Sequence, residues 1–172
     1  MALRTDIFDL SGLRLSSGEG RRLDLEVAIE PFELGGERYE TASGAVPVRL
    51  DVSRTTGEGY ALRLRFTAEL TGPCMRCLEA AHVSCDVDAR EVSQPREGDD
   101  LQSPYVDHGL LDLHAWARDA LGLMLPTRLL CRPDCAGLCP ICGADLNLAG
   151  PGHEHEREPD PRWAKLSSLR FD

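Results

Sequence analysis

The stretch that decides the fold of this 172-residue chain is YALRLRFTAEL, which runs from Tyr60 to Leu70. Apolar residues alternate along it with polar, charged or small ones. Successive side chains of a β-strand point to opposite faces, so this period of two predicts a strand with one buried and one solvated face. The buried face is expected to carry Leu62, Leu64, Phe66, Ala68 and Leu70.

The same period recurs on both sides of this stretch. RLDLEVAIE (22–30) and VPVRLDV (46–52) precede it, and a fourth run follows in which Val83, Cys85, Val87 and Ala89 share one face. Gly35-Gly36 and the TTGEG segment from Thr55 supply turns between these runs. Residues 1–92 are therefore expected to form an antiparallel sheet, curled into a barrel-like or sandwich form. Cys85 is expected to be a small buried apolar side chain in that sheet.

The alternation stops after the fourth run. Residues 93–111 carry prolines, glycines and charges, which predicts a loop or linker. Asp112 can cap a helix that Pro126 should end. Residues 112–172 are expected to hold this helix, a small cysteine-rich zinc-knuckle module and a short C-terminal helix over 160–171, so the fold class is α+β. The helix is expected to bury Leu113, Trp116, Ala120 and either Leu121 or Met124.

Charge limits the function classes. The chain carries 29 acidic and 19 basic residues, a formal net charge of −10, and Lys165 is its single lysine. This balance argues against binding nucleic acid over the whole surface, but it permits a local basic face or a basic protein partner. The N-terminus MALRTDIFDL lacks the pattern of a signal peptide, and no run approaches the ~18 apolar residues of a membrane span. We expect a cytoplasmic protein with reduced thiols and no membrane partner.

Four of the seven cysteines lie in CRPDCAGLCPIC (131–142), and Gly143 completes a CPxCG turn. An odd number of cysteines argues against a closed disulfide framework. Clustered thiolates repel one another unless a cation holds them, and structural zinc takes four sulfur or nitrogen ligands in a closed tetrahedron. The simplest assignment places one structural Zn²⁺ between Cys131, Cys135, Cys139 and Cys142.

A second assignment divides the ligands between two ions, and the sequence leaves both assignments open. The first ion would bind the CPxCG knuckle and the two histidines of HEH, which lie on one side of an extended segment. Its ligands would be Cys139, Cys142, His153 and His155. The second ion would bind the CxxC pair between the last two predicted strands and the start of the cysteine run. Its ligands would be Cys74, Cys77, Cys131 and Cys135.

Redox chemistry and catalysis are weaker interpretations. The CxxC at Cys74 lies in a strand–turn–strand pattern, whereas thioredoxin-type pairs begin a helix. The spacing from Cys135 to Cys142 matches CxxxCxxC of radical enzymes that hold an iron–sulfur cluster, but those motifs precede a large α/β barrel. The sequence contains no GxSxG, P-loop or GxGxxG motif, so we expect a protein that is not an enzyme. His82, His108 and His114 have no partner at metal-ligand spacing and are expected at the surface.

The two cysteine blocks together resemble a known family. CMRCL (74–78), a helix ending in Leu125-Pro126, LCRPDCAGLCPICGADLN (130–147) and DPRWAKLSSL (160–169) are similar, in this order, to the bacterial YceD family. The resemblance covers nearly the whole chain. Many relatives carry CxC where His153 and His155 stand here, and this exchange retains two side chains that bind zinc.

The resemblance implies a non-enzymatic factor in the accumulation and processing of 23S ribosomal RNA. Its partner would be pre-23S rRNA or an assembly intermediate of the large ribosomal subunit. An alternative is a zinc-stabilised adaptor for a basic ribosomal protein. Arg76, Arg128 and Arg132 flank the cysteine blocks and are the candidate contacts to RNA phosphates.

Overall fold

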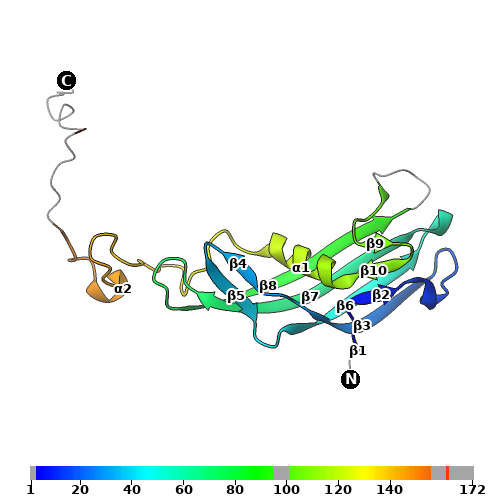
Figure 1. The fold of residues 1–172 in the computed structure, drawn as a ribbon, viewed down its shortest axis with the longest axis horizontal. Helices are drawn as coiled ribbons and strands as arrows, with labels where there is room; N and C mark the ends of the chain where they lie inside the picture. The colour runs from blue at the N-terminus through cyan, green and yellow to red at the C-terminus, as the bar shows by residue number, and fades with distance from the viewer. Residues whose placement is uncertain (1–2, 95–100, 156–161, 163–172) are drawn as a thin grey trace.

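The computed structural model describes residues 3–94, 101–155 and 162 (Figure 1). Its main sheet has seven strands, and a second sheet has three. The main sheet consists of β1 (Leu3–Arg4), β3 (Gly20–Ala28), β4 (Phe32–Leu34), β5 (Glu37–Thr41), β6 (Ala45–Arg54), β7 (Tyr60–Pro73) and β8 (Ala80–Ser93). The second sheet consists of β2 (Ile7–Asp9), β9 (Val106–Asp107) and β10 (Leu110–Asp112). The helices are η1 (Ser11–Leu13), η2 (Thr56–Glu58), α1 (Leu113–Met124) and α2 (Leu146–Ala149).

β7 organises the main sheet. It pairs antiparallel with β8 along its whole length, from Tyr60 opposite Ser93 to Pro73 opposite Ala80. On its other side it pairs first with β6 and then, near its end, with β5. The predicted inward residues of β7 are all buried, because they face the core that α1 closes. The period of two therefore predicted this strand and its buried face correctly.

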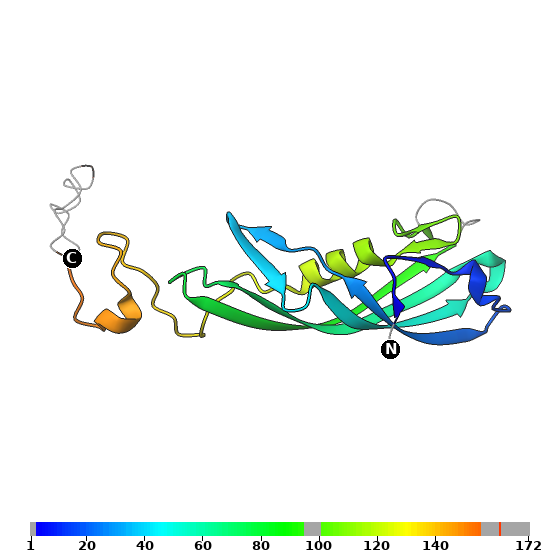
Figure 2. The same cartoon turned by 60° about the horizontal axis from the view of Figure 1, so that its bottom comes forward.

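α1 lies against one face of the sheet and contacts β8 and β3 (Figure 2). Asp112 caps it as predicted: the carboxylate accepts a hydrogen bond from the Ala115 N–H at 2.9 Å. Leu121 is fully buried, whereas the Met124 side chain is half exposed, so Leu121 rather than Met124 belongs to the buried face of the helix. The helix ends at Met124, ahead of Pro126. The α+β class is confirmed.

Three details differ from the expected layout. β1 pairs parallel with β3, whereas the sequence predicts an antiparallel sheet throughout. The sheet curves but stays open, since β8 pairs with β7 alone among the described strands and α1 fills the concave side. The expected linker 93–111 contains β9 and most of β10. β10 pairs with β2, and this pairing fully buries Leu111. The helix expected over 160–171 lies outside the described residues. Within the described part of the chain, no helix has the length and apolar character that crossing a membrane requires.

Candidate metal centres

The turn between β7 and β8 has the backbone of a zinc knuckle. The Leu78 N–H donates to the Cys74 carbonyl at 3.0 Å, and the Cys74 N–H donates to the Glu79 carbonyl at 2.7 Å. Leu78 has a φ of 64°, in the left-handed region. This conformation turns the chain sharply after Cys77, so that both thiols of the CxxC pair point to the same side.

Residues 139–144 repeat the same turn. The Gly143 N–H donates to the Cys139 carbonyl at 2.8 Å, and the Cys139 N–H donates to the Ala144 carbonyl at 2.8 Å. Gly143 has a φ of 74° and takes the place of Leu78. The glycine of CPxCG identified this knuckle from the sequence. The first knuckle was harder to recognise because a leucine occupies the left-handed position.

Four cysteines from two distant segments form the first centre, which we call the four-cysteine cluster. Cys74 and Cys77 come from the β7–β8 turn, and Cys131 and Cys135 follow α1. Their ligand atoms all lie within 4.8 Å of one another. The Sγ atoms of Cys74 and Cys135 are 3.8 Å apart, and those of Cys77 and Cys131 are 3.5 Å apart. Tetrahedral zinc with Zn–S bonds of ~2.3 Å requires sulfurs roughly 3.8 Å apart, so the site fits this ion.

Two cysteines and two histidines form the second centre, the cysteine–histidine cluster. The Cys139 Sγ lies 3.3 Å from His155 Nε2, and the Cys142 Sγ lies 3.4 Å from His153 Nε2. The two Nε2 atoms are 3.0 Å apart. Tetrahedral zinc with these ligands requires sulfur–nitrogen separations of about 3.6 Å and a nitrogen–nitrogen separation of about 3.4 Å. The cluster is slightly tighter than this ideal and matches it in shape.

The structure thus divides the cysteine run between two centres. Cys131 and Cys135 join the β7–β8 turn, while Cys139 and Cys142 join the histidines. This is the second of the two assignments that the sequence left open. The simplest assignment, with all four cysteines around one ion, is not the arrangement observed. The chain turns away between the two pairs at Gly137, whose φ is 83°.

The thiols of the four-cysteine cluster differ in the direction in which their surroundings shift the pKa. Burial opposes ionisation of Cys74, but backbone N–H groups of Cys77, Cys131 and Arg76 point at its sulfur and lower its pKa to about 6. For Cys77 a backbone hydrogen bond from Glu79 favours the thiolate, yet burial and the neighbouring thiols raise its pKa to about 12. Burial also raises the pKa of Cys131. A divalent cation resolves this conflict, because it favours the thiolate form of all four ligands.

In the second centre the knuckle backbone favours an anion. The N–H groups of Cys142 and Ile141 point at the Cys139 sulfur, and they lower the pKa of this thiol to about 6 against the effect of burial. This centre is the more open of the two, since Cys142 and His155 are exposed and only Cys139 is buried. In the four-cysteine cluster, Cys131 is the most exposed ligand and the other three are buried.

Residues outside the ligand sets hold the two centres together. Arg76 Nη1 donates to the Cys135 carbonyl at 2.6 Å, and the Leu138 N–H donates to the Arg76 carbonyl at 3.0 Å. Asn147 Nδ2 donates to the Cys135 sulfur at 3.7 Å, and its Oδ1 accepts from the Ala136 N–H at 2.7 Å. Hydrogen bonds of this kind orient metal ligands. Asn147 lies in the ADLN segment, but no spacing rule marked it as a support for Cys135.

The remaining predicted residues lie apart from the ligands. Cys85 is buried in the main core, as expected, and its thiol points to the Met124 carbonyl. His82 and His108 are exposed, whereas His114 is half-buried on α1. Arg128 is exposed, and Arg132 forms an ion pair with Asp134 at 3.4 Å. The contact of these arginines with RNA stays a prediction.

An open, mostly antiparallel sheet with two knuckle-based cysteine or cysteine–histidine clusters at one end defines the class of this protein: a β-sheet protein whose C-terminal module could hold metal ions. A family model described as large ribosomal RNA subunit accumulation protein YceD matches residues 62–170, so the chain belongs to the YceD family. The match includes both knuckles and all eight cluster ligands.

Relatives of the chain occur in mycobacteria. An uncharacterized protein of Mycobacterium tuberculosis (strain H37Rv) is 35% identical over 164 residues, covering 91% of this chain and 78% of the relative. An uncharacterized protein of Mycobacterium leprae is 34% identical over 176 residues, covering 95% of this chain and 76% of the relative. No solved structure matches the chain at a significant level.

Proposed function

We propose that this protein is a non-enzymatic cytoplasmic factor that maintains the synthesis, processing or stability of 23S rRNA during assembly of the large ribosomal subunit. Its membership of the YceD family, whose description names large ribosomal RNA subunit accumulation, carries this proposal. Its partner is pre-23S rRNA or an assembly intermediate that contains it.

The metal centres support a binding role rather than catalysis. Each centre has four ligands from the protein, which is the closed coordination of structural zinc and leaves no position for a substrate. The four-cysteine cluster joins the β7–β8 turn to the segment after α1, so zinc there fixes the C-terminal module against the sheet. We propose Zn²⁺ as the structural ion in both centres.

Depletion of the protein in its own bacterium tests this function. We expect the ratio of 23S to 16S rRNA to fall and precursor particles of the large subunit to accumulate in sucrose gradients. Re-expression of the wild-type chain should restore both, and Cys74→Ser should restore them less well. Unchanged rRNA levels and gradients after depletion would refute the proposal.

The net charge of −10 favours a second candidate, an adaptor for a basic ribosomal protein. Affinity purification from cells, with and without ribonuclease, separates the two. A basic ribosomal protein that stays bound after ribonuclease treatment supports the adaptor, whereas loss of all ribosomal components supports the RNA factor.

A further inference from the structure

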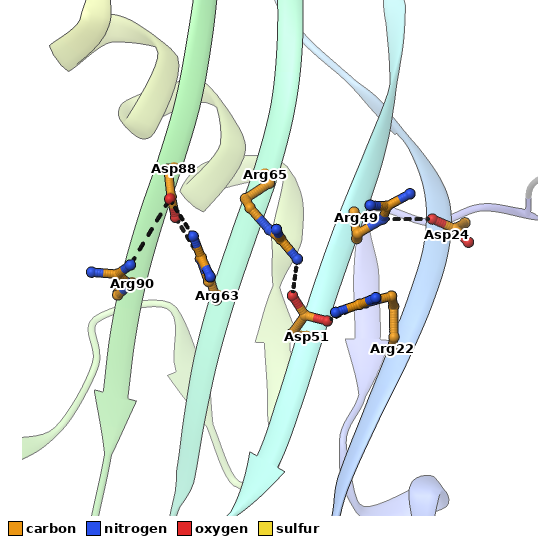
Figure 3. A network of polar contacts seen from close by, with 8 residues as sticks. All are labelled: Arg22, Asp24, Arg49, Asp51, Arg63, Arg65, Asp88 and Arg90. Carbon is orange, nitrogen blue, oxygen red and sulfur yellow. Dashed lines mark hydrogen bonds and ion pairs between the residues drawn. The ribbon is translucent and has the colours of Figure 1, made fainter.

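The solvent-facing side of the main sheet carries an arginine-rich patch (Figure 3). Eight charged side chains from four adjacent strands lie side by side on the face opposite α1, and we call them the arginine patch. They are Arg22 and Asp24 of β3, Arg49 and Asp51 of β6, Arg63 and Arg65 of β7, and Asp88 and Arg90 of β8. Five guanidinium groups and three carboxylates leave a formal charge of +2, on a chain whose total is −10.

The strand register places six pairs of these side chains directly opposite one another, of which four join an arginine with an aspartate and two join arginines. Arg63 lies directly opposite Arg90, and Arg49 lies directly opposite Arg65. Like charges opposite one another on a sheet destabilise the pairing, and a ladder built only to stabilise the strands would alternate in sign. The five arginines outnumber the three carboxylates, and the surplus positive charge falls at the two Arg–Arg pairs.

The three aspartates hold the arginines in place without covering them. Asp51 accepts from Arg22 Nε at 2.7 Å and from Arg65 Nη2 at 2.5 Å. Asp88 accepts from Arg63 through two nitrogens, at 2.7 and 2.5 Å. Each bond occupies only one or two of the five N–H groups of a guanidinium. The Nε of Arg65 is itself buried, so the more exposed arginines of the patch offer the accessible donors.

Exposure is greatest at the two ends of the patch. The Arg22 and Arg90 side chains are 61% and 70% exposed, and the ion pair of Arg90 with Asp88 is 3.9 Å long. The hollow that Arg49 and Arg65 line also has Asp24, Asp86 and Asp88 in its lining. The accessible surplus of positive charge therefore lies at Arg22 and Arg90 instead. A planar, forked donor set of this kind suits phosphate oxygens, which guanidinium groups bind in pairs.

The chemistry of the patch also limits the form of the nucleic acid. None of the eight side chains is aromatic, so the patch offers no ring on which an unpaired base can stack. Double-helical RNA is recognised through its phosphates and shape instead. Glu26, Glu69 and Asp86 lie on the same face nearer the metal centres, which confines the basic region to the part of the sheet away from them.

We propose that the arginine patch binds the phosphate backbone of a double-helical RNA segment. This inference rests on the proposed function and deepens it by giving the RNA a surface on the sheet, away from the arginines that flank the cysteines. Binding there is independent of base sequence and weakens as salt increases, because each phosphate contact releases a counterion.

The test compares two double variants with the same change in charge. Arg22→Gln with Arg90→Gln alters the patch, and both aspartates keep a second arginine, Arg65 or Arg63, so the sheet should remain folded. Arg21→Gln with Arg38→Gln is the control, since these arginines are exposed and lie outside the patch. The probe is a synthetic RNA hairpin with a double-helical stem, and fluorescence anisotropy of the zinc-loaded full chain gives the affinity at several salt concentrations.

We expect the patch variant to bind about tenfold more weakly at ~0.1 M salt, with a salt dependence reduced by roughly 0.7–0.9 per lost phosphate contact. The control should bind as the wild type does. Equal losses in both variants, or an unchanged patch variant of native thermal stability, would overturn the proposal. The depletion experiment stands apart: an rRNA defect without binding of the hairpin refutes the patch alone, whereas binding without an rRNA defect refutes the function.

Discussion

Gly143 and Leu78 occupy equivalent positions in the two knuckles, and both have a left-handed backbone. A side chain in this conformation costs about 1–2 kcal/mol, which glycine avoids. Leu78 accepts that cost although its side chain is 60% exposed. The comparison indicates that the backbone of the knuckle imposes the left-handed conformation, because packing of the exposed Leu78 side chain contributes little to it.

Gly143→Ala should weaken zinc binding at the cysteine–histidine cluster about fivefold, which corresponds to ~1 kcal/mol of backbone strain. A Cβ at this position meets nothing within 4 Å, so the effect comes from conformation alone. Competition with a chromogenic chelator measures the affinity. Gly143→Asn is the matched control, because asparagine tolerates the left-handed region and should retain nearly wild-type affinity. Equal affinities for all three proteins would contradict this explanation.

At the scale of elements, the β7–β8 hairpin and the segment after α1 meet at the four-cysteine cluster and at the Met75 N–H, which donates to the Leu129 carbonyl at 2.9 Å. The four-cysteine cluster lies in a small hydrophobic cluster of its own, which contains Ala81 and is bordered by Leu130 and Leu138. It is separate from the main core between α1 and the sheet. Zinc is therefore expected to contribute much of the stability of this contact.

Metal analysis of purified protein should find two zinc ions per chain. Cys74→Ser should lose one of them and retain the other, because Cys74 belongs only to the four-cysteine cluster. Cys85→Ala is the control: its thiol is buried outside both clusters, so it should retain both ions. A single ion per chain that survives in Cys74→Ser would instead support the one-ion assignment of the cysteine run.

The ion pairs of the sheet predict that the stability of the fold decreases at acid pH. The hydrogen bond from Arg22 lowers the pKa of Asp51 below its usual value; burial opposes this shift, and the hydrogen bond from Arg65 adds to it. Ionised Asp51 therefore stabilises the fold fully above the unfolded pKa of about 3.9, and this contribution is lost as pH falls through the lower folded value.

Asp51→Asn should reduce the free energy of unfolding by about 1 kcal/mol at pH 7, and the difference from wild type should shrink below about pH 4. Urea denaturation at both pH values measures it. Asp24→Asn is the control, since this carboxylate is 74% exposed and its pair with Arg49 is longer, at 3.3 Å. A deficit for Asp51→Asn that is the same at about pH 3 and pH 7 would show that the ion pairs are not its cause.

At the scale of the whole molecule, the two metal centres lie at one end of an elongated sheet, and the arginine patch lies on its outer face (Figures 1 and 3). The main core does not include the cluster ligands. Removing the metal should therefore release the C-terminal module and leave the sheet folded.

Limited proteolysis before and after chelation tests this division. We expect chelation to expose sites within residues 131–155, while a fragment that contains β3, β6, β7, β8 and α1 resists cleavage. The far-ultraviolet circular dichroism of the sheet should change little, and added zinc should restore protection. Loss of the whole β signal on chelation would show that the metal centres support the entire fold.

Much of the fold followed from local pattern. The alternation in YALRLRFTAEL and its neighbours predicted the strands and their buried faces, because burial of one face repeats with the period of the strand itself. Asp112 and Pro126 predicted the two ends of α1, because both the capping hydrogen bond and the steric effect of the proline ring act within one helical turn. The short strands β9 and β10 escaped notice, since Leu111 acquires its role only by pairing with β2.

The sequence by itself determined that this chain has a mostly antiparallel sheet, one principal helix and eight residues suited to binding metal. Only the tertiary structure decided how those eight residues combine. Cys74 and Cys135 are neighbours because the β7–β8 turn and the chain after α1 end at the same place, and the left-handed Gly137 sends Cys139 and Cys142 away to the histidines. The arginine patch has the same origin: its charges are spread over four strands, and strand register alone places them together.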